Sequence, residues 1–521
     1  MKRLFTLAAL AVSALDAMAT DYTDVLEVSV NGVPSTQTAT ISVNKNANGN
    51  YDLALKNFML VAGTESLPVG NIEMTNVSGT TSADGVTTLT HQATVPITDG
   101  DDPKVAQWFG PLMIKQVPVV MTAELRDSSL YTVLDIDLSA TLGQVVKVVF
   151  GNGGYQIANS GFELFHTAKA DKNGKYTSDE PNSWHSFMSC TGTFSALVCA
   201  TPHTFISNDV RPGSTGKKSV LVTSGEVFGV PANGTITTGR LNAGSITPAD
   251  ILNCAFLDMT NTDADSNGDP FYTKLNGAPD SLAVWVKFKQ GTLDKPEYKC
   301  ATLSAAITNG GYYQDPGDSV LANVVARGSN KAIESKGNVW QRVTMPFDYD
   351  SYTCSDIKAI LITLSTNAEP GVASKESKAP DSLLIDDLSL IYNAKLASLN
   401  VPGFSKDVMD YETAVNGQIS LDDIQAVADG RGAKVTKALE TVDGGVKATV
   451  TVKSGDLRSS NVYTILYKGA TVSGINLTEK SAPVGVSAVY DLNGQRVDTM
   501  RSGRIYIEKR TDGTVVKTIK R

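Results

Sequence analysis

The sequence has little of what most enzyme classes need. Its 521 residues include only four histidines and five cysteines, and no pair of them shows the spacing of a zinc site. It also lacks a nucleophile elbow, a phosphate-binding loop and the glycine fingerprint of dinucleotide-binding domains. A glycosidase, however, needs only two carboxylates at a set separation, which a sequence does not reveal. Hydrolysis of a glycan therefore stays open.

Positive charge and long apolar runs are also scarce. Lysine and arginine number 45 against 54 acidic residues, which gives a formal net charge of −9. An acidic protein of this kind is a poor partner for nucleic acid. No run approaches the roughly 18 apolar residues that a membrane-spanning helix needs. We therefore expect no nucleic-acid partner, no transmembrane span and at most a peripheral association with an outer membrane.

The start of the chain has the three parts of a secretory signal peptide. Lys2 and Arg3 are basic, Leu4 to Leu15 is apolar, and Ala17-Met18-Ala19 offers small residues for cleavage. The pattern predicts a signal peptide over residues 1–19. The mature protein is then exported to the periplasm, the outer cell surface or the medium.

Export permits disulfides, although an odd number of cysteines leaves at least one thiol unpaired. Cys190 and Cys199 are close in sequence and are the candidates for one bridge. The alternative is that both are buried thiols.

Glycine and proline are plentiful, with 44 and 20 residues, and they separate short runs rich in valine, threonine and isoleucine. This composition and length predict an all-β protein of three or four domains. Residues 20–152 contain successive hairpin patterns, such as Thr38–Val43 with Tyr51–Phe58, and about eight strands fit a closed barrel. The segment resembles calycin-like β-barrel domains, with Trp108 expected in the barrel core.

The middle of the chain begins with Asn159-Ser160-Gly161-Phe162-Glu163 and ends with the alternating strand Ser382–Leu390. Between them come Pro181-Asn182-Ser183-Trp184, the run Pro279–Phe288 and Trp340. This order resembles the carbohydrate metabolism domain family, a galactose-binding-like jelly roll. The resemblance implies a jelly-roll β-sandwich over residues 155–393 and a glycan or polysaccharide partner.

Three carboxylates of this domain are candidates for a metal site. In an antiparallel jelly roll the first and last strands can lie side by side, which would bring Glu163 close to Asp386 and Asp387. Calcium prefers six to eight oxygen ligands, so we expect a structural Ca²⁺ there. The alternative is that backbone N–H groups satisfy the three carboxylates and anchor a loop.

A second acidic segment, Asp263 to Asp269, matches the first half of a calcium loop. Lys274 stands where such a loop has its bidentate glutamate, so a solvated Asn-Gly turn is the favoured interpretation. His166, His185 and His203 are close in sequence to Cys190 and Cys199, but we expect ordinary loop histidines there.

Aromatic side chains stack on the apolar faces of sugars, and amides and acids bind the hydroxyls. Asp315, Asn309 and Arg327 are polar candidates near such aromatic residues. The aromatic ligand-binding candidates are Trp184, Tyr272, Tyr312 and Tyr313.

Two smaller units follow. Residues 394–470 resemble a cadherin-like or immunoglobulin-like module, in which Ser420–Asp429 is expected to be helical. Residues 485–521 resemble a secretion sorting tail and predict a terminal β-hairpin.

The whole sequence predicts an exported glycan-binding or glycan-capturing protein without catalysis of its own. The alternatives are a glycoside hydrolase with paired carboxylates and a structural surface or adhesion protein.

Overall fold

The structure of the chain is a computed structural model that divides into two compact units. One comprises Met1–Gly153 with Thr478–Arg521, and the other Gly154–Leu477. The predicted signal peptide lies outside the described residues, except for Ala19. The structure describes residues 19–62, 65–83, 85–126, 128–169, 175–227, 229–291, 300–317, 321–368, 380–472, 486–490, 496–497, 505–510 and 515–519.

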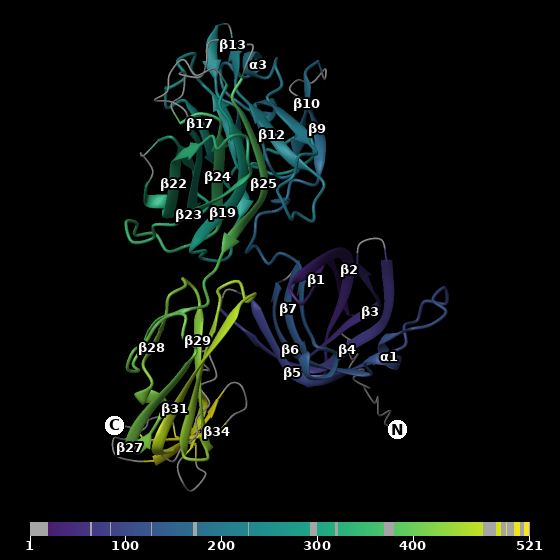
Figure 1. Cartoon of the computed structure of the whole chain (residues 1–521), viewed down its shortest axis with the longest axis vertical. Helices are drawn as coiled ribbons and strands as arrows, with labels where there is room; N and C mark the ends of the chain where they lie inside the picture. Colours follow the sequence, from purple (N-terminus) through teal and green to yellow (C-terminus); the bar gives the residue numbers. More distant parts are fainter. Residues whose placement is uncertain are drawn as a thin grey trace, which may run out of the picture. The chain divides into compact units, whose positions relative to one another are not determined.

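Residues 20–150 form a closed barrel of eight antiparallel strands in chain order (Figure 1). The first strand also pairs with the last, with Leu26 opposite Phe150. This confirms the predicted barrel. Its strands are β1 (Thr20–Val30), β2 (Val33–Lys45), β3 (Tyr51–Ala62), β4 (Glu65–Thr81), β5 (Thr87–Thr98), β6 (Gln116–Arg126), β7 (Ser129–Leu138) and β8 (Gln144–Phe150), with short helices α1 (Gly110–Met113) and α2 (Ser139–Leu142).

The barrel interior is filled by the inward-facing residues of every strand. Leu53, Leu89 and Met121 are among its fully buried side chains. Alternation of apolar and polar residues produces this core, because successive residues of a strand point to opposite faces. Trp108 is buried too, but it covers Gly100 in the loop before α1, where a Cβ on that glycine would lie 2.3 Å from the indole ring.

The second unit contains two five-stranded antiparallel sheets, which confirms the predicted all-β fold class. One sheet has the order β11 (Thr204–Ser207), β12 (Ser219–Thr223), β25 (Ser382–Ile391), β19 (Ser281–Lys289) and β23 (Gln341–Pro346). The other has the order β15 (Thr235–Thr237), β24 (Ala359–Ser365), β20 (Cys300–Thr308) and β22 (Val324–Glu334), with β18 (Thr273–Lys274) on β24 as its fifth strand.

A third, smaller sheet covers part of the second one. It consists of β16 (Arg240–Ala243), β17 (Asn253–Leu257) and β21 (Tyr313–Asp315). Leu241, Leu257 and Tyr313 of this sheet form a core cluster with Ala306 of β20 and Leu361 of β24. The remaining elements are the hairpins β9 (Phe165–Lys169) with β10 (Thr177–Pro181) and β13 (Gly225–Val227) with β14 (Val230–Ala232), and the short helices η1 (Phe187–Ser189), α3 (Ser195–Val198) and η3 (Leu321–Asn323).

A smaller module follows within the same unit. Strand β27 pairs with β31 in parallel, and the other pairs are antiparallel. The segment predicted to be helical is instead one 3₁₀ turn, η4 (Leu421–Asp423), and a short strand; Ser420 and Asp423 cap that turn, which ends at the buried Ile424. The strands are β26 (Leu396–Leu399), β27 (Asp410–Ile419), β28 (Ala426–Ala428), β29 (Lys434–Val442), β30 (Gly445–Lys453) and β31 (Ser460–Val472).

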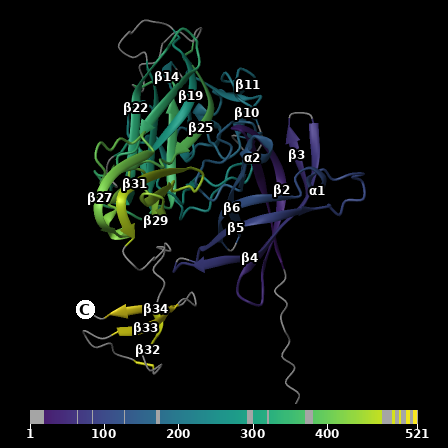
Figure 2. The same ribbon diagram turned by 60° about the horizontal axis from the view of Figure 1, so that its bottom comes forward.

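The last described strands are β32 (Val486–Tyr490), β33 (Ile505–Arg510) and β34 (Val515–Ile519), which form a three-stranded antiparallel sheet (Figure 2). The rest of the predicted sorting tail lies outside the described residues. Within the part of the chain that the structure describes, no helix has the length and apolar character to cross a membrane.

Candidate functional site

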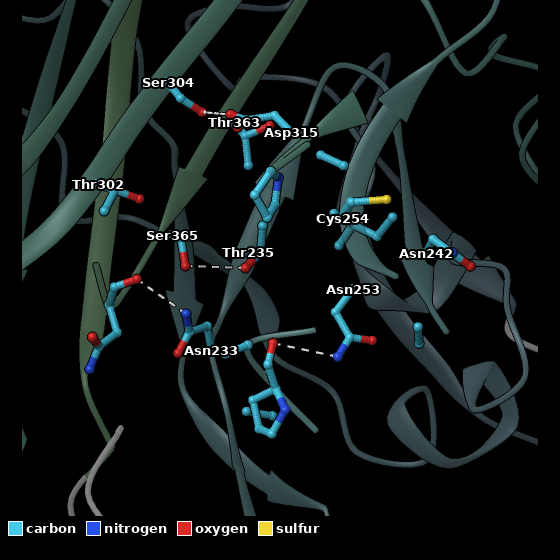
Figure 3. A pocket seen from close by; sticks show the side chains of 18 of the residues that line it. Asn233, Thr235, Asn242, Asn253, Cys254, Thr302, Ser304, Asp315, Thr363 and Ser365 are labelled. Carbon is cyan, nitrogen blue, oxygen red and sulfur yellow. Dashed lines mark hydrogen bonds between the residues drawn. The ribbon is translucent and has the colours of Figure 1, made fainter. Parts of the chain in front are cut away.

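A cavity of about 590 Å³ lies in the second unit, next to the small sheet β16–β17–β21. Its lining residues come from β15, β20, β22 and β24, from the small sheet, and from α3 and the hairpin β13–β14. Figure 3 shows their polar side chains around one space. This volume falls in the range of about 300–1,000 Å³ that is typical of small-molecule sites.

The cavity exists because one face of the second sheet is apolar at one end of its strands and lined by small polar residues at the other. On β20, Ala306 packs in the core cluster, whereas Ser304 and Thr302 continue the same face into the cavity. Their antiparallel partners on β24 are Thr363 and Ser365, respectively. Small hydroxyl side chains thus line the end of the face that the core cluster does not fill.

A charged pair lies beside these hydroxyl groups. The Ser304 hydroxyl donates to Asp315 Oδ2 over 2.5 Å, and the Arg327 guanidinium lies 4.0 Å from Asp315 Oδ1. Asp315 sits at the end of β21 and Arg327 on β22, so two separate sheets position the pair. The cavity therefore offers both a carboxylate and a guanidinium to a polar ligand.

Three asparagines add amide groups to the wall. Asn242 and Asn253 donate to backbone carbonyls, Asn242 to Leu252 over 2.8 Å and Asn253 to Thr247 over 2.9 Å. Asn233 donates to the Asn367 carbonyl over 3.1 Å, while its own Oδ1 is buried and has no partner among the described residues. A buried acceptor without a partner is costly, and a ligand donor would satisfy it.

Other parts of the wall are apolar. Phe187, Phe194 and Leu241 line it. Burial, and secondarily the charge of Asp315, raise the pKa of the Cys254 thiol to about 11. This thiol is protonated at neutral pH and is a poor nucleophile.

The structure brings the two ends of the predicted jelly-roll segment, residues 155–393, close together. The Leu388 N–H donates to the Ser160 carbonyl over 2.9 Å, and a Cβ on Gly161 would lie 3.3 Å from Asp387 Oδ1. Glu163 and Asp387 bind the same connecting segment, residues 211–218.

Protein donors satisfy these carboxylates. Glu163 Oε1 accepts the N–H groups of Lys217 and Lys218, each over 2.9 Å. Asp387 Oδ2 accepts from Arg211 Nε over 2.5 Å and from the Ser214 hydroxyl over 3.1 Å. These hydrogen bonds hold residues 211–218 in place, as expected if the acids anchor a loop.

Asp386 is held differently. Its Oδ2 accepts the Arg211 N–H over 2.9 Å, whereas its Oδ1 is buried without a partner among the described residues. Burial raises the pKa of this carboxyl to about 6. A calcium ion here would lie close to the Arg211 guanidinium, which repels it. Calcium binding by Glu163, Asp386 and Asp387 stays a prediction.

None of the four aromatic candidates is among the described residues that line the cavity. Trp184 is fully buried, with its ring 5.0 Å from that of Phe162, and Tyr313 is 1% exposed in the core cluster, so neither ring is accessible to a glycan. Tyr272 is half-buried against the same cluster. Tyr312 is 40% exposed, and its hydroxyl donates to Gln314.

Cys190 and Cys199 are thiols in the structure, which corresponds to the alternative to the predicted disulfide. Burial, and then the charge of Cys199, raise the pKa of Cys190 to about 12. This environment disfavours the reactive thiolate.

The chain matches no curated protein. Residues 18–153 match the calycin-like β-barrel domain family, and this match covers the eight strands of the closed barrel. The front of the chain is therefore a calycin-like β-barrel domain, which indicates a binding function.

Proposed function

We propose that the protein is exported and binds a glycan in the cavity beside β16–β17–β21, without catalysis of its own. The observation that carries this proposal is the hydroxyl and amide lining of the cavity. It extends over Thr302, Ser304, Thr363 and Ser365 and includes the unsatisfied Asn233 Oδ1.

The chemistry of this lining matches that of a sugar. Each sugar hydroxyl both donates and accepts, and serine, threonine and asparagine side chains offer both functions. Asp315 supplies a charged acceptor and Arg327 a charged donor, which strengthen such bonds. Phe187 and Phe194 provide apolar surface for the C–H faces of a sugar ring.

The lining supports binding over hydrolysis. Glycosidases use two carboxyl groups on either side of the scissile bond. Asp315 is the single carboxylate among the described residues that line the cavity, and it accepts from Ser304 and faces Arg327. A two-carboxyl mechanism would therefore lack its second carboxyl group among these residues.

The proposal is tested on the full mature chain with a glycan array, followed by calorimetric titration of the best glycan. We expect Thr302→Val and Asp315→Asn each to weaken binding about 5- to 30-fold, because each removes a bonding group worth about 1–2 kcal/mol. Thr344→Val is the matched control, since Thr344 is exposed on β23, outside the cavity.

Three results would contradict parts of the proposal. Equal affinities for the cavity variants and the control would remove the cavity as the site. Release of reducing sugar from a polysaccharide panel would favour the hydrolase alternative. A cytoplasmic chain that keeps residues 1–19 would contradict export, which N-terminal sequencing of fractionated cells reveals.

A further inference from the structure

Three side chains outside the cavity, those of His166, Glu180 and Asp265, each place one potential ligand atom within 4.8 Å of the others, and His185 lies beside Asp265. His166 and Glu180 are cross-strand partners in the hairpin β9–β10. Asp265 comes from the loop Asp263–Asp269, and His185 from the segment after β10. His166 Nε2 lies 3.8 Å from Glu180 Oε2 and 3.5 Å from Asp265 Oδ2, and His185 Nε2 lies 3.6 Å from Asp265 Oδ2.

This cluster, His166–Glu180–His185–Asp265, is buried and unsatisfied. The side chains of Glu180, His185 and Asp265 are fully buried, and that of His166 is 10% exposed. The four facing atoms have no hydrogen-bond partner among the described residues. Their separations exceed those of hydrogen bonds, so the polar groups face one another across a gap. Two buried carboxylates in this state are costly unless a cation lies between them.

The second oxygen of each carboxylate is held by the protein. Glu180 Oε1 accepts the Ser186 N–H over 2.6 Å and the Ser189 hydroxyl over 2.9 Å. Asp265 Oδ1 accepts the N–H groups of Asn267 and Asp269 over 2.9 and 2.8 Å. Each carboxylate is therefore oriented with its other oxygen toward the common point.

The imidazole of His166 is oriented in the same manner. Its Nδ1 lies 3.2 Å from Asn182 Oδ1. An Nδ1–H that donates to this oxygen leaves the lone pair of Nε2 directed at the cluster. Outer hydrogen bonds of this kind fix the tautomer and orientation of histidine ligands in metal sites.

We propose that His166, Glu180 and Asp265 bind a divalent transition metal of the zinc class. Metal–ligand bonds of about 2.0–2.2 Å in a tetrahedron place ligand atoms about 3.3–3.6 Å apart, and small side-chain movements would bring these three ligand atoms, which lie within 4.8 Å of one another, to that spacing. One divalent ion would balance the two carboxylate charges. An imidazole ligand favours zinc over calcium, which prefers oxygen ligands.

The metal's role is structural, because the three ligand side chains are buried or nearly so. The ion would join the hairpin β9–β10 to the loop Asp263–Asp269, and a water molecule or the neighbouring His185 would complete the tetrahedron. The Ser183 N–H, in the segment after β10, already donates to Asp269 Oδ2 in this loop over 2.7 Å. The proposal is independent of the glycan cavity, because it depends on different side chains.

The test begins with the full mature wild-type chain, freed of metal by a chelator and titrated with zinc. We expect one zinc per chain by elemental analysis, a visible absorption spectrum of tetrahedral cobalt after cobalt substitution, and a higher melting temperature with zinc than with chelator. Calcium at the same concentration should not raise the melting temperature through this site.

Asp265→Asn tests the ligand set, because an asparagine keeps the oxygen that closes the turn and loses the charged ligand. We expect zinc affinity to fall more than about 100-fold. Asp263→Asn is the matched control in the same loop, since Asp263 binds Arg240 at 3.0 Å, and it should bind zinc as the wild type does. A folded wild type that takes up neither zinc nor cobalt overturns the proposal, and so does an Asp265→Asn variant with unchanged affinity. If that variant does not fold, the wild-type uptake and spectrum decide.

Discussion

At the scale of single residues, Asp386 is a carboxyl that the fold buries with only half of its hydrogen bonds. One oxygen accepts the Arg211 N–H and the other has no partner among the described residues. Burial raises its pKa from 3.8 to about 6. The folded protein therefore holds this proton more tightly than the unfolded chain does.

The stability of the second unit should consequently depend on the protonation of Asp386. The protonated carboxyl makes its full contribution to the free energy of unfolding below pH 4. This contribution is lost as the pH rises through about 6. After allowance for solvent screening, we expect a loss of about 1 kcal/mol between pH 4 and pH 7.5. Urea unfolding at both pH values measures it.

Asp386→Asn removes the ionisable group and keeps an acceptor for the Arg211 N–H. The variant should show a smaller loss of stability with rising pH than the wild type. Asp443→Asn, at an exposed turn, serves as control and should leave the pH dependence as it is. A variant with the full wild-type pH dependence would contradict the assignment to Asp386.

The sequence could not predict most site residues, for a physical reason. Thr302 and Ser365 are small polar residues within strands, and only their antiparallel pairing, across about 60 positions, gathers them on one face. His166, Glu180 and Asp265 likewise come from two segments far apart, so sequence spacing shows no metal motif. Two signals were present in the sequence. One was the clustering of the histidines along the chain, and the other was the pair of polar candidates Asp315 and Arg327, which line the cavity.

At the scale of elements, the barrel was predictable and the three-layer arrangement of the second unit was not. Hairpins such as β2–β3 show alternating side chains and an Asn-Gly-rich turn, which are local signals. The small sheet β16–β17–β21 has short strands whose role appears only when they cover another sheet. The parallel pairing of β27 with β31 is also non-local and has no local sequence signal.

Gly239, between β15 and β16, allows the small sheet β16–β17–β21 to pack closely on the second sheet. A Cβ there would lie 2.2 Å from the Phe256 carbonyl oxygen and 2.4 Å from Leu361 Cδ1. We expect Gly239→Ala to destabilise the second unit by about 1–3 kcal/mol, because backbone must move to admit the methyl group. Thermal unfolding measures the loss, and an unchanged melting temperature would show that the two layers are less tightly packed here.

At the scale of the molecule, the small module of β26–β31 belongs to the same compact unit as the two five-stranded sheets, Gly154–Leu477. Asp280, the residue before β19, connects the sheets to the module. Its carboxylate accepts the Asn393 N–H over 2.6 Å and the Arg431 N–H over 2.7 Å. Burial raises the pKa of Asp280. One side chain thus satisfies backbone donors of both the linker and the module.

Asp280→Ala should uncouple the unfolding of the small module from the unfolding of the sheets that precede it. Two backbone donors would lose their acceptor, at a cost of about 2–4 kcal/mol, and calorimetry should show a broadened or divided transition. Asp350→Ala is the control, because Asp350 binds the side chain of Arg431 at the surface and should contribute little. A single sharp transition at the wild-type temperature would contradict the connecting role of Asp280.

The closure of the barrel has a consequence for how this domain joins other sequences. Since β1 pairs with β8, and the Gly151 N–H donates to the Val25 carbonyl over 2.9 Å, the polypeptide leaves the barrel beside the strand by which it enters. The two ends of this domain therefore lie along one wall, and an engineer could insert it into a surface loop of a host protein through short linkers.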